Sequence, residues 1–146
     1  MTVDIEPTLF IHWLTSFAMT VVIWFVQLVH YPIFIWGNKT TFNQFMREHQ
    51  YRITIIVAPL MLVELWSAHV FIHQHITFIE FVILTLNAVI WLSTILLQVP
   101  YHNVLSTGYN KEIITKLVHT NWIRTIAWTV KTGLVSILIF QQHFNT

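Results

Sequence analysis

The chain has 146 residues, of which 55% are hydrophobic and 9% are charged, and its mean hydropathy is +0.65. Because a soluble domain carries about a quarter charged residues, this composition excludes an ordinary soluble fold and favours a membrane protein. The absence of cysteine excludes disulfides, iron–sulfur clusters and thiolate metal sites. The net charge of +1 gives no reason to expect a nucleic-acid partner.

Four long apolar stretches follow one another along the chain and predict helices over roughly 8–36, 41–73, 77–106 and 111–142. Each stretch exceeds the roughly 20 residues that a helix needs to cross a hydrocarbon core of about 30 Å. The stretches are too long for strands and lack the alternation of polar and apolar residues that strands show. We therefore expect one membrane domain over 1–146, an all-α four-transmembrane-helix bundle in the lipid bilayer.

The start of the chain and its turns agree with this fold. The first helix is not expected to be a removable signal peptide, because Asp4 and Glu6 precede it and no small-residue cleavage site follows it. Gly37 and Gly108 supply backbone freedom for two of the turns. Asn110 favours a helix start directly after the second of these turns.

The basic residues predict how the bundle crosses the membrane. Six of the seven lysines and arginines lie in or beside the connections 37–52 and 103–124. They are Lys39, Arg47, Arg52, Lys111, Lys116 and Arg124. The opposite side carries Asp4, Glu6 and Glu80 and no basic residue. The positive-inside rule therefore predicts cytoplasmic connections and non-cytoplasmic termini, in what we expect to be a bacterial inner membrane.

The two halves of the sequence resemble each other at an offset of 72 residues. At this offset His30 aligns with His102, and Arg52 aligns with Arg124. A true repeat predicts two pseudo-repeated helical hairpins that run in the same direction, related by an axis along the membrane normal. The identities are few, so a chance match stays open as the alternative.

Every predicted helix carries a polar stripe at helical spacing. The stripes contain His12, Ser16, Gln27 and His30; His49, Arg52, Glu64 and Ser67; Glu80, Asn87, Trp91, Gln98 and His102; and Asn121, Arg124, Thr125, Trp128, Lys131, Thr132 and Ser136. Since an unsatisfied polar group in hydrocarbon costs several kcal/mol, the stripes are expected to meet inside the bundle. His119 lies about 200° around its helix from Asn121, so we expect Asn121 inside and His119 at the rim.

Two prolines follow histidines closely in the first and third helices. Pro32 and Pro100 lie two residues beyond His30 and His102. A proline inside a helix frees a carbonyl group and kinks the axis, which would open the cytoplasmic end of the bundle for a ligand. The alternative is that the two helices end nearby.

Matching the helices by depth brings His30, His49 and His102 into one layer near the cytoplasmic interface. We predict these three residues as the candidate site, either as catalytic bases or as ligands of a transition metal through neutral imidazole nitrogens. Two of the histidines can instead hold a b-type haem. Plain hydrogen bonds between helices are the alternative to any of these roles.

Other polar residues of the stripes are predicted to hold a substrate. Arg52 and Arg124 suit an anionic group, because guanidinium binds planar anions, although anchoring to lipid head groups stays open. The residues expected to orient the substrate are Gln27, Gln98, Asn103, Asn121 and Trp128. Glu64 lies about 22 Å along its helix from His49, too far to share the histidine layer. It is expected to form a buried ion pair with Lys131.

A second group of histidines lies toward the opposite, outer face. It contains His69, His73 and His75, with His12 and Glu80 nearby. His69 and His73 are spaced to chelate a metal, but they point away from the face of His49. We interpret the group as interfacial residues.

Two short motifs in the second half of the chain are VPYHNVL at 99–105 and NWIRTIAW at 121–128. They resemble the Pro-x-x-Asn-x-Leu and Asn-x-x-Arg-Thr segments of the anthrone-oxygenase-like family of small four-helix membrane proteins. The matching positions are Pro100, Asn103, Leu105, Asn121, Arg124 and Thr125. His30, His49 and His102 depart from that pattern and indicate a separate branch. The resemblance implies oxidation of an electron-rich polycyclic phenol by dioxygen, with a histidine as the base and arginine holding the anion.

These observations predict a small integral-membrane oxidoreductase that acts on a hydrophobic, phenolic or quinone-like substrate. The alternative is a non-enzymatic subunit that binds haem, metal or lipid, as a homo-oligomer or within a larger membrane complex. A transporter is disfavoured, because four helices leave little room for alternating access.

Overall fold

The structure is a computed structural model that describes residues 6–72 and 77–144. Within these residues, four helical spans are long and apolar enough to cross a membrane: Pro7–Trp36, Phe42–Val70, Phe78–Leu105 and Lys111–Gln142. The predicted all-α bundle of four transmembrane helices is therefore confirmed. Large apolar side chains such as Phe17, Leu28 and Leu96 are exposed around the outside, where they face the lipid bilayer.

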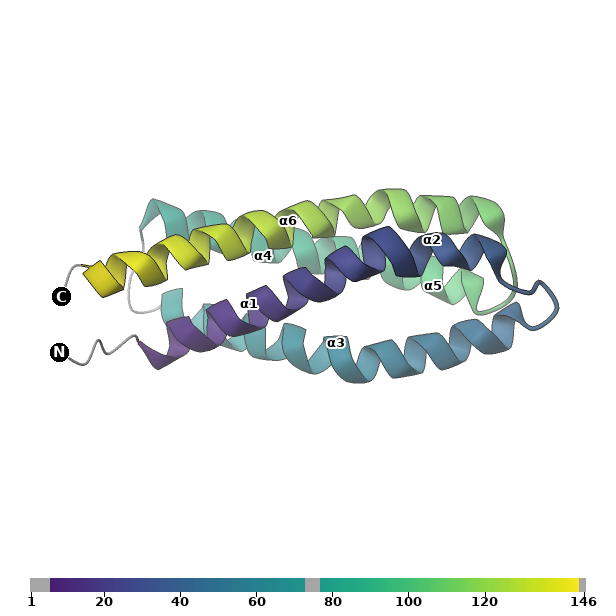
Figure 1. Cartoon of the computed structure of the whole chain (residues 1–146), viewed down its shortest axis with the longest axis horizontal. Coiled ribbons are helices and arrows are strands. Elements are labelled where there is room, and N and C mark those ends of the chain that lie inside the picture. Colours follow the sequence, from purple (N-terminus) through teal and green to yellow (C-terminus); the bar gives the residue numbers. More distant parts are fainter. Residues whose placement is uncertain (1–5, 73–76, 145–146) are drawn as a thin grey trace.

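Each span is built from one or more helical segments. The first consists of α1 (Pro7–Phe25), η1 (Val26–His30), α2 (Tyr31–Ile33) and η2 (Phe34–Trp36); the second is α3 (Phe42–Ile72); the third consists of α4 (Phe78–Ser93), η3 (Thr94–Gln98) and α5 (Val99–Leu105); and the fourth is α6 (Lys111–Phe144). The start of α1 and the end of α6 lie at one end of the bundle (Figure 1). The connections from η2 to α3 and from α5 to α6 lie at the other end.

Local turn chemistry positions the helix ends. The side chain of Asn110 accepts a hydrogen bond from the Ile113 amide at 3.1 Å, and this caps the start of α6 as expected. At the start of α4, the Glu80 carboxylate accepts a hydrogen bond from the Thr77 amide in a capping box. Both caps satisfy amide groups that the first helical turn leaves without partners.

Pro32 and Pro100 do not end their helices, and each lies in a short α-helical segment directly after a π-helical turn. A π-helical turn precedes each proline: the amide of Tyr31 bonds to the carbonyl of Val26, and the amide of Val99 bonds to that of Thr94. Beyond Pro32 and Pro100 the helical backbone continues to Trp36 and Leu105. Proline cannot donate to the regular helical ladder, and the wider turn accommodates the missing bond.

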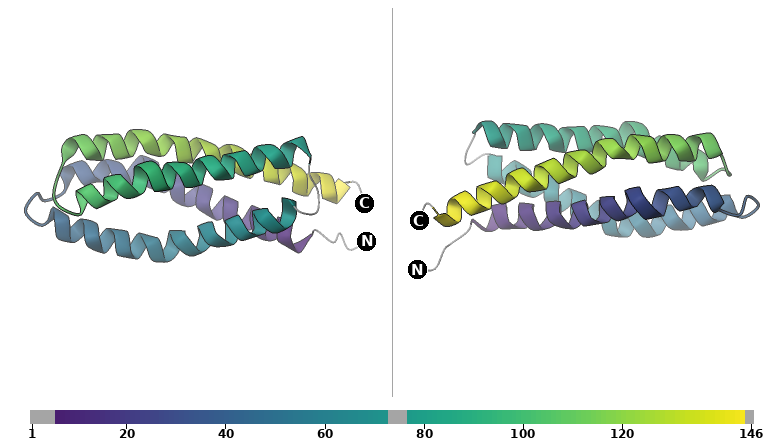
Figure 2. Two further views of the ribbon diagram at one scale, coloured as in Figure 1. Left: turned by 180° about the vertical axis from the view of Figure 1, so that it is seen from behind. Right: turned by 45° about the horizontal axis from the view of Figure 1, so that its top comes forward.

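The interfaces between the spans are not equivalent. The first span packs closely on both α3 and α6, and α4 packs closely on α6, whereas α3 makes few contacts with α4 and α5. Figure 2 shows α3 beside the first span in both further views. In the predicted pseudo-repeat, the first span corresponds to the third and α3 corresponds to α6. The close α1–α6 interface therefore has its counterpart between α4 and α3, and that second interface is open.

The core is packed with large side chains toward the connection end of the bundle. Met19, Phe34, Phe42 and Leu105 are all at least 99% buried within the main apolar cluster. Lipid tails are as apolar as these side chains, so close packing and buried polar links, rather than the hydrophobic effect, hold such helices together.

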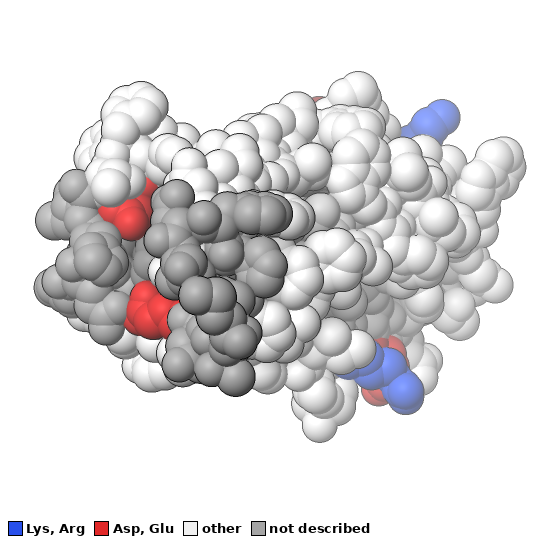
Figure 3. Space-filling view, turned by 60° about the vertical axis from the view of Figure 1, so that its left-hand side comes forward, with Lys and Arg blue, Asp and Glu red and all other residues white. Residues whose placement is uncertain are grey.

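Charge is distributed unevenly along the bundle. Acidic side chains lie at the end where α1 begins, and basic side chains lie toward the connection end (Figure 3). Arg52 and Lys116 at the connection end form exposed pairs with Glu48 and Glu112. The asymmetry that the sequence predicts is thus present in the folded chain.

Candidate functional site

A cavity of about 300 Å³ lies inside the bundle, next to the open interface between α3 and the third span. Its wall is largely apolar and includes Met19, Val22 and Val26 on the first span and Val57 and Met61 on α3. This volume lies at the lower end of the range of about 300–1,000 Å³ that is typical of ligand pockets. The cavity therefore suits a small hydrophobic molecule.

The mouth of the cavity faces the membrane sideways. Thr54 and Leu62 on α3 and Val99 on α5 line the cavity and are themselves exposed on the outer surface of the bundle. They stand on either side of the interface where α3 makes few contacts with α4 and α5. A molecule dissolved in the bilayer can therefore enter between these helices without crossing water.

One end of the cavity is polar. Tyr31, Gln98, His102 and Arg124 line it together with Trp91. The Tyr31 hydroxyl lies 2.9 Å from His102 Nε2 and next to the Arg124 guanidinium. The Arg124 side chain is 6% exposed, and its Cζ lies 5.2 Å from the centre of the Trp128 ring. A buried cation and two neutral hydrogen-bonding groups therefore meet at one point of an apolar wall.

Several polar atoms at this end have no hydrogen-bond partner among the described residues. They are Trp91 Nε1, Gln98 Oε1, His102 Nδ1 and Arg124 Nε. An unsatisfied buried polar group costs about 1–3 kcal/mol, so a cluster of four such atoms around one cavity is unusual. An oxygen atom of a bound molecule would accept from the N–H groups of Trp91 and Arg124, and a hydroxyl would donate to Gln98 Oε1.

The structure brings the three predicted histidines together at the connection end of the bundle. His30 Nε2 lies 3.0 Å from His49 Nδ1, and the ring centres of His49 and His102 are 5.5 Å apart. His102 alone of the three lines the cavity, whereas His30 and His49 line a shallow groove on the outer surface between α3 and the first span. Phe34 and Phe45 pack against the His49 ring.

This arrangement does not fit a preformed three-histidine metal site. His30 and His49 are at hydrogen-bond distance, and His102 Nε2 faces Tyr31. Among the described residues no group of three or more His, Asp or Glu side chains is placed to hold a metal ion. Phe34 and Phe45 pack against the ring of His49, one of the predicted haem ligands. The donor atoms are arranged for hydrogen bonding.

Gln27 and Asn121 are joined to each other rather than to the cavity. The Asn121 amide donates to Gln27 Oε1 at 2.9 Å, and the Gln27 amide donates to the Val118 carbonyl at 3.2 Å. Both side chains are buried, as the sequence predicts for Asn121, and they tie the first span to α6. His119 is exposed at the rim, also as predicted.

The prediction that Arg52 lies inside the bundle with Arg124 is wrong. The Arg52 side chain is 79% exposed and pairs with Glu48 one turn earlier, with Arg52 Nε 3.4 Å from Glu48 Oε2. Because α3 stands apart from the third span, the buried face of α3 is narrow here and Arg52 falls outside it. Asn103, another residue predicted to contact substrate, is also exposed and does not line the cavity.

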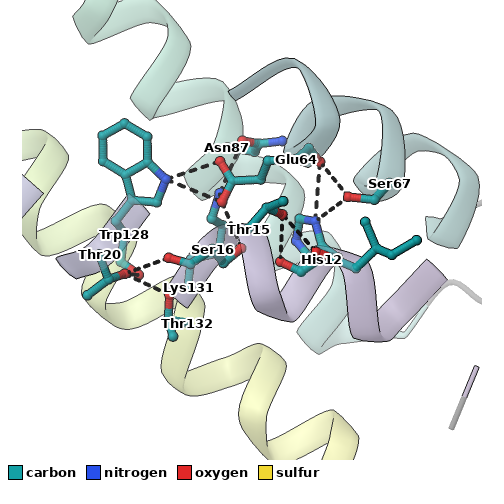
Figure 4. Close-up of polar contacts among 11 residues, drawn as sticks. His12, Thr15, Ser16, Thr20, Glu64, Ser67, Asn87, Trp128, Lys131 and Thr132 are labelled. Carbon is teal, nitrogen blue, oxygen red and sulfur yellow. Dashed lines mark hydrogen bonds and ion pairs between the residues drawn. The ribbon is translucent and has the colours of Figure 1, made fainter. Parts of the chain in front are cut away.

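A second polar cluster lies deeper, between the cavity and the end where α1 begins (Figure 4). Glu64 Oε1 lies 2.8 Å from Lys131 Nζ, which is the pairing expected from the sequence. The carboxylate also accepts hydrogen bonds from Ser16 Oγ at 2.7 Å and from Trp128 Nε1 at 3.1 Å. Lys131 donates to Asn87 Oδ1 at 3.2 Å. Residues of all four spans thus meet at one buried ion pair.

Trp128 belongs to this cluster and not to the cavity wall. Its side chain is fully buried, its Nε1 donates to Glu64, and one face of its ring lies near Arg124. Trp128 therefore links the buried ion pair to the arginine of the cavity. The sequence predicts that Trp128 contacts substrate directly. In the structure Trp128 lies one layer of residues behind the cavity wall.

His12 and His69 take a structural and a peripheral position. His12 is buried, and its Nδ1 lies 3.1 Å from Ser67 Oγ and 3.2 Å from the Glu64 carbonyl. His69 is exposed near the end of the second span. His73 and His75 lie outside the described residues, so their predicted interfacial position stays a prediction.

Tyr31 is the cavity residue that sequence reasoning missed. It lies on no polar stripe at regular helical spacing, because the π-helical turn η1 rotates the backbone just before it. Its neighbours in the sequence, His30 and Pro32, were the available signals.

No protein-family model, curated protein or solved structure matches this chain.

Proposed function

We propose that this chain is a small integral-membrane oxidoreductase whose substrate is a hydrophobic, phenolic or quinone-like molecule drawn sideways from the bilayer. The observation that carries the proposal is the cavity itself, which is apolar along its wall, open toward lipid and lined at one end by Tyr31, Gln98, His102 and Arg124. Ligand pockets typically combine an apolar lining with a few polar groups that fix orientation.

The polar groups have distinct roles in this proposal. Arg124 and the Gln98 side chain contact the oxygen substituents of the substrate, and Trp91 stacks against its ring. The hydroxyl proton of the substrate passes to His102, which is paired with the Tyr31 hydroxyl and whose Nδ1 has no hydrogen-bond partner among the described residues. His30 and His49 lie behind His102, where they line the outer groove. We propose that they act as further bases that support His102.

The proposed reaction consumes dioxygen as the oxidant. Loss of the hydroxyl proton makes the ring carbon opposite the oxygen electron-rich, and that carbon reduces dioxygen and forms a carbon–oxygen bond with it. The peroxide takes up the proton, and the carbon then loses its C–H hydrogen and the outer oxygen as water. One hydroxyarene and one dioxygen thus give one quinone and one water, and the arene is oxidised by four electrons.

The same proposal includes a location and an orientation. Basic connections at one end of the bundle and acidic side chains at the other favour cytoplasmic connections and non-cytoplasmic termini. The site would then lie in the cytoplasmic half of a membrane, which we propose to be a bacterial inner membrane.

The test is oxygen uptake by the purified chain in lipid nanodiscs with anthrone, a hydrophobic substrate that tautomerises to a phenol. We expect uptake above that of empty nanodiscs, with the quinone formed in equal amount to the dioxygen consumed. His102→Gln and Arg124→Gln should abolish the increment, whereas the exposed Arg52→Gln should retain it. Equal uptake by all variants, or none above the lipid blank, would contradict the proposal.

The second candidate is a non-enzymatic subunit that binds lipid, haem or a metal, within a homo-oligomer or a larger complex. The lateral mouth and the apolar wall of the cavity favour lipid among these ligands. An absorption spectrum, elemental analysis and lipid mass spectrometry on the same purified sample separate the candidates. A Soret band, a stoichiometric metal or a co-purified acyl lipid together with no oxygen uptake would favour the subunit.

A further inference from the structure

The charges buried inside the bundle do not balance. Arg124 and Lys131 are two buried cations, and Glu64 is the carboxylate buried with them. Glu80 is also buried, but its carboxylate caps α4 at Thr77. The 11 residues from Glu80 to Trp91, the nearest cavity residue on this span, place it about 17 Å from the cavity at 1.5 Å per residue.

Glu64 is fully engaged away from Arg124. Its oxygens accept from Lys131, Ser16 and Trp128, and the Trp128 indole stands between this carboxylate and the guanidinium. Among the described residues Arg124 forms no ion pair with any carboxylate, and its Nε has no hydrogen-bond partner. Arginine stays protonated in proteins, so it cannot shed this charge by losing a proton.

We infer that the cavity holds its substrate as an aromatic anion, a phenolate or enolate left when the hydroxyl proton is lost, whose charged oxygen supplies the missing partner of Arg124. The inference rests on the proposed function for its site and narrows the substrate from phenolic or quinone-like molecules to those that ionise. A buried charge is stable only when it is paired and hydrogen-bonded, and the guanidinium beside the cavity is the one buried cation of the described core that lacks such a partner.

The surroundings of Arg124 favour an aromatic anion over an inorganic one. Tyr31 and His102 offer hydrogen bonds on one side of the guanidinium, and the rest of the cavity wall is apolar. A small hydrated anion would lose its water and gain no contact with Met19, Val57 or Met61. An aromatic ring with one charged oxygen fills the apolar part and pairs at the polar end.

The test compares two ligands that differ in one methyl group. 2-Hydroxy-1,4-naphthoquinone is an anion at neutral pH, and its methyl ether, 2-methoxy-1,4-naphthoquinone, cannot ionise. Dissociation constants are measured by quenching of tryptophan fluorescence with the full chain in neutral-lipid nanodiscs. We expect the anion to bind at least about thirty-fold more tightly than the ether, as for a buried charge pair. Equal affinity of the wild-type chain for the two ligands would overturn the inference, and no variant has to fold for that result.

Variants then assign the preference to Arg124. Arg124→Gln should remove the preference for the anion, Arg124→Lys should retain part of it, and the exposed Arg52→Gln should leave it unchanged. A preference that survives in a folded Arg124→Gln would overturn the assignment. Dodecanoate is added as a competitor, and displacement of the naphthoquinone at equal concentration would overturn the aromatic class in favour of a fatty acid.

The outcomes for the inference and for the proposed function are separate. Anion preference without oxygen uptake would leave the inference standing and remove the enzymatic proposal. Oxygen uptake without anion preference would keep the enzymatic proposal and remove the inference.

Discussion

Glu64 and Lys131 form an ion pair across the centre of the bundle, with Glu64 Oε1 2.8 Å from Lys131 Nζ and neither side chain exposed. Lys131→Met leaves the carboxylate without its counter-charge, and removal of one partner of a buried pair costs about 3–5 kcal/mol. We expect the free energy of unfolding in mixed micelles to fall by that order. The double variant Glu64→Gln/Lys131→Met should recover much of the loss, because it keeps an acceptor for Trp128 and removes both charges.

Lys116→Met is the matched control for the buried pair. Lys116 forms an exposed pair with Glu112, and water solvates both groups when the pair is broken. The free energy of unfolding of this variant should be close to that of the parent chain. If Lys131→Met is equally harmless, the buried pair does not hold the bundle together.

Gly37→Ala is expected to destabilise the first connection. A Cβ at this position would lie 2.7 Å from the Phe42 ring and 3.1 Å from the Phe34 carbonyl, and both side chains are tightly packed. Overpacking of this kind costs about 1–3 kcal/mol. Gly108→Ala is the control, since a Cβ there meets nothing within 4 Å. Thermal unfolding in detergent should show a lower Tm for Gly37→Ala alone.

Gln27 and Gln98 are expected to differ in what their loss affects. Gln27→Leu breaks the hydrogen bonds to Asn121 and Val118, each worth about 0.6–2 kcal/mol between membrane helices, without altering the cavity lining. Gln98→Leu changes the polar end of the cavity and loses one hydrogen bond to Thr120. We predict that the first variant lowers stability and the second lowers affinity for 2-hydroxy-1,4-naphthoquinone. The opposite pattern would contradict the assignment of Gln98 to the cavity.

Trp128 is expected to position Arg124 through its ring and to stabilise the bundle through its N–H group. Trp128→Phe keeps a ring near Arg124 and removes the donor to Glu64, so stability should fall by about 1–3 kcal/mol while anion affinity is largely kept. Trp128→Leu removes both and should lower affinity as well. Equal affinities of the Phe and Leu variants would exclude the positioning role.

The orientation in the membrane can be measured directly because the chain has no cysteine. Single cysteines at Asn38, at Asn110 and at Thr77 report the two basic connections and the opposite end. We expect a membrane-impermeant maleimide added to intact cells to label only the Thr77 variant. Labelling of Asn38 and Asn110 instead would reverse the proposed orientation.

Much of the fold could be predicted from the sequence because hydropathy in a membrane acts on whole segments. A lipid-facing helix must satisfy its backbone internally and be long enough to cross, so four apolar stretches dictate four spans. Pairing of Glu64 with Lys131 was also predictable, since depth along two helices and the cost of lone charges leave few partners. The burial of Asn121 and the exposure of His119 followed from helical angle alone.

Only the tertiary structure decided which polar residues reach the cavity. The π-helical turns shift the backbone angle before Pro32 and Pro100, so a stripe counted at 100° per residue misses Tyr31. Helical spacing places Arg52 and Arg124 alike, yet α3 stands apart from the third span and leaves Arg52 exposed on the outer surface. Sequence periodicity fixes the direction of a side chain on its own helix, whereas burial depends on whether another helix packs there, and that is a property of the assembled bundle.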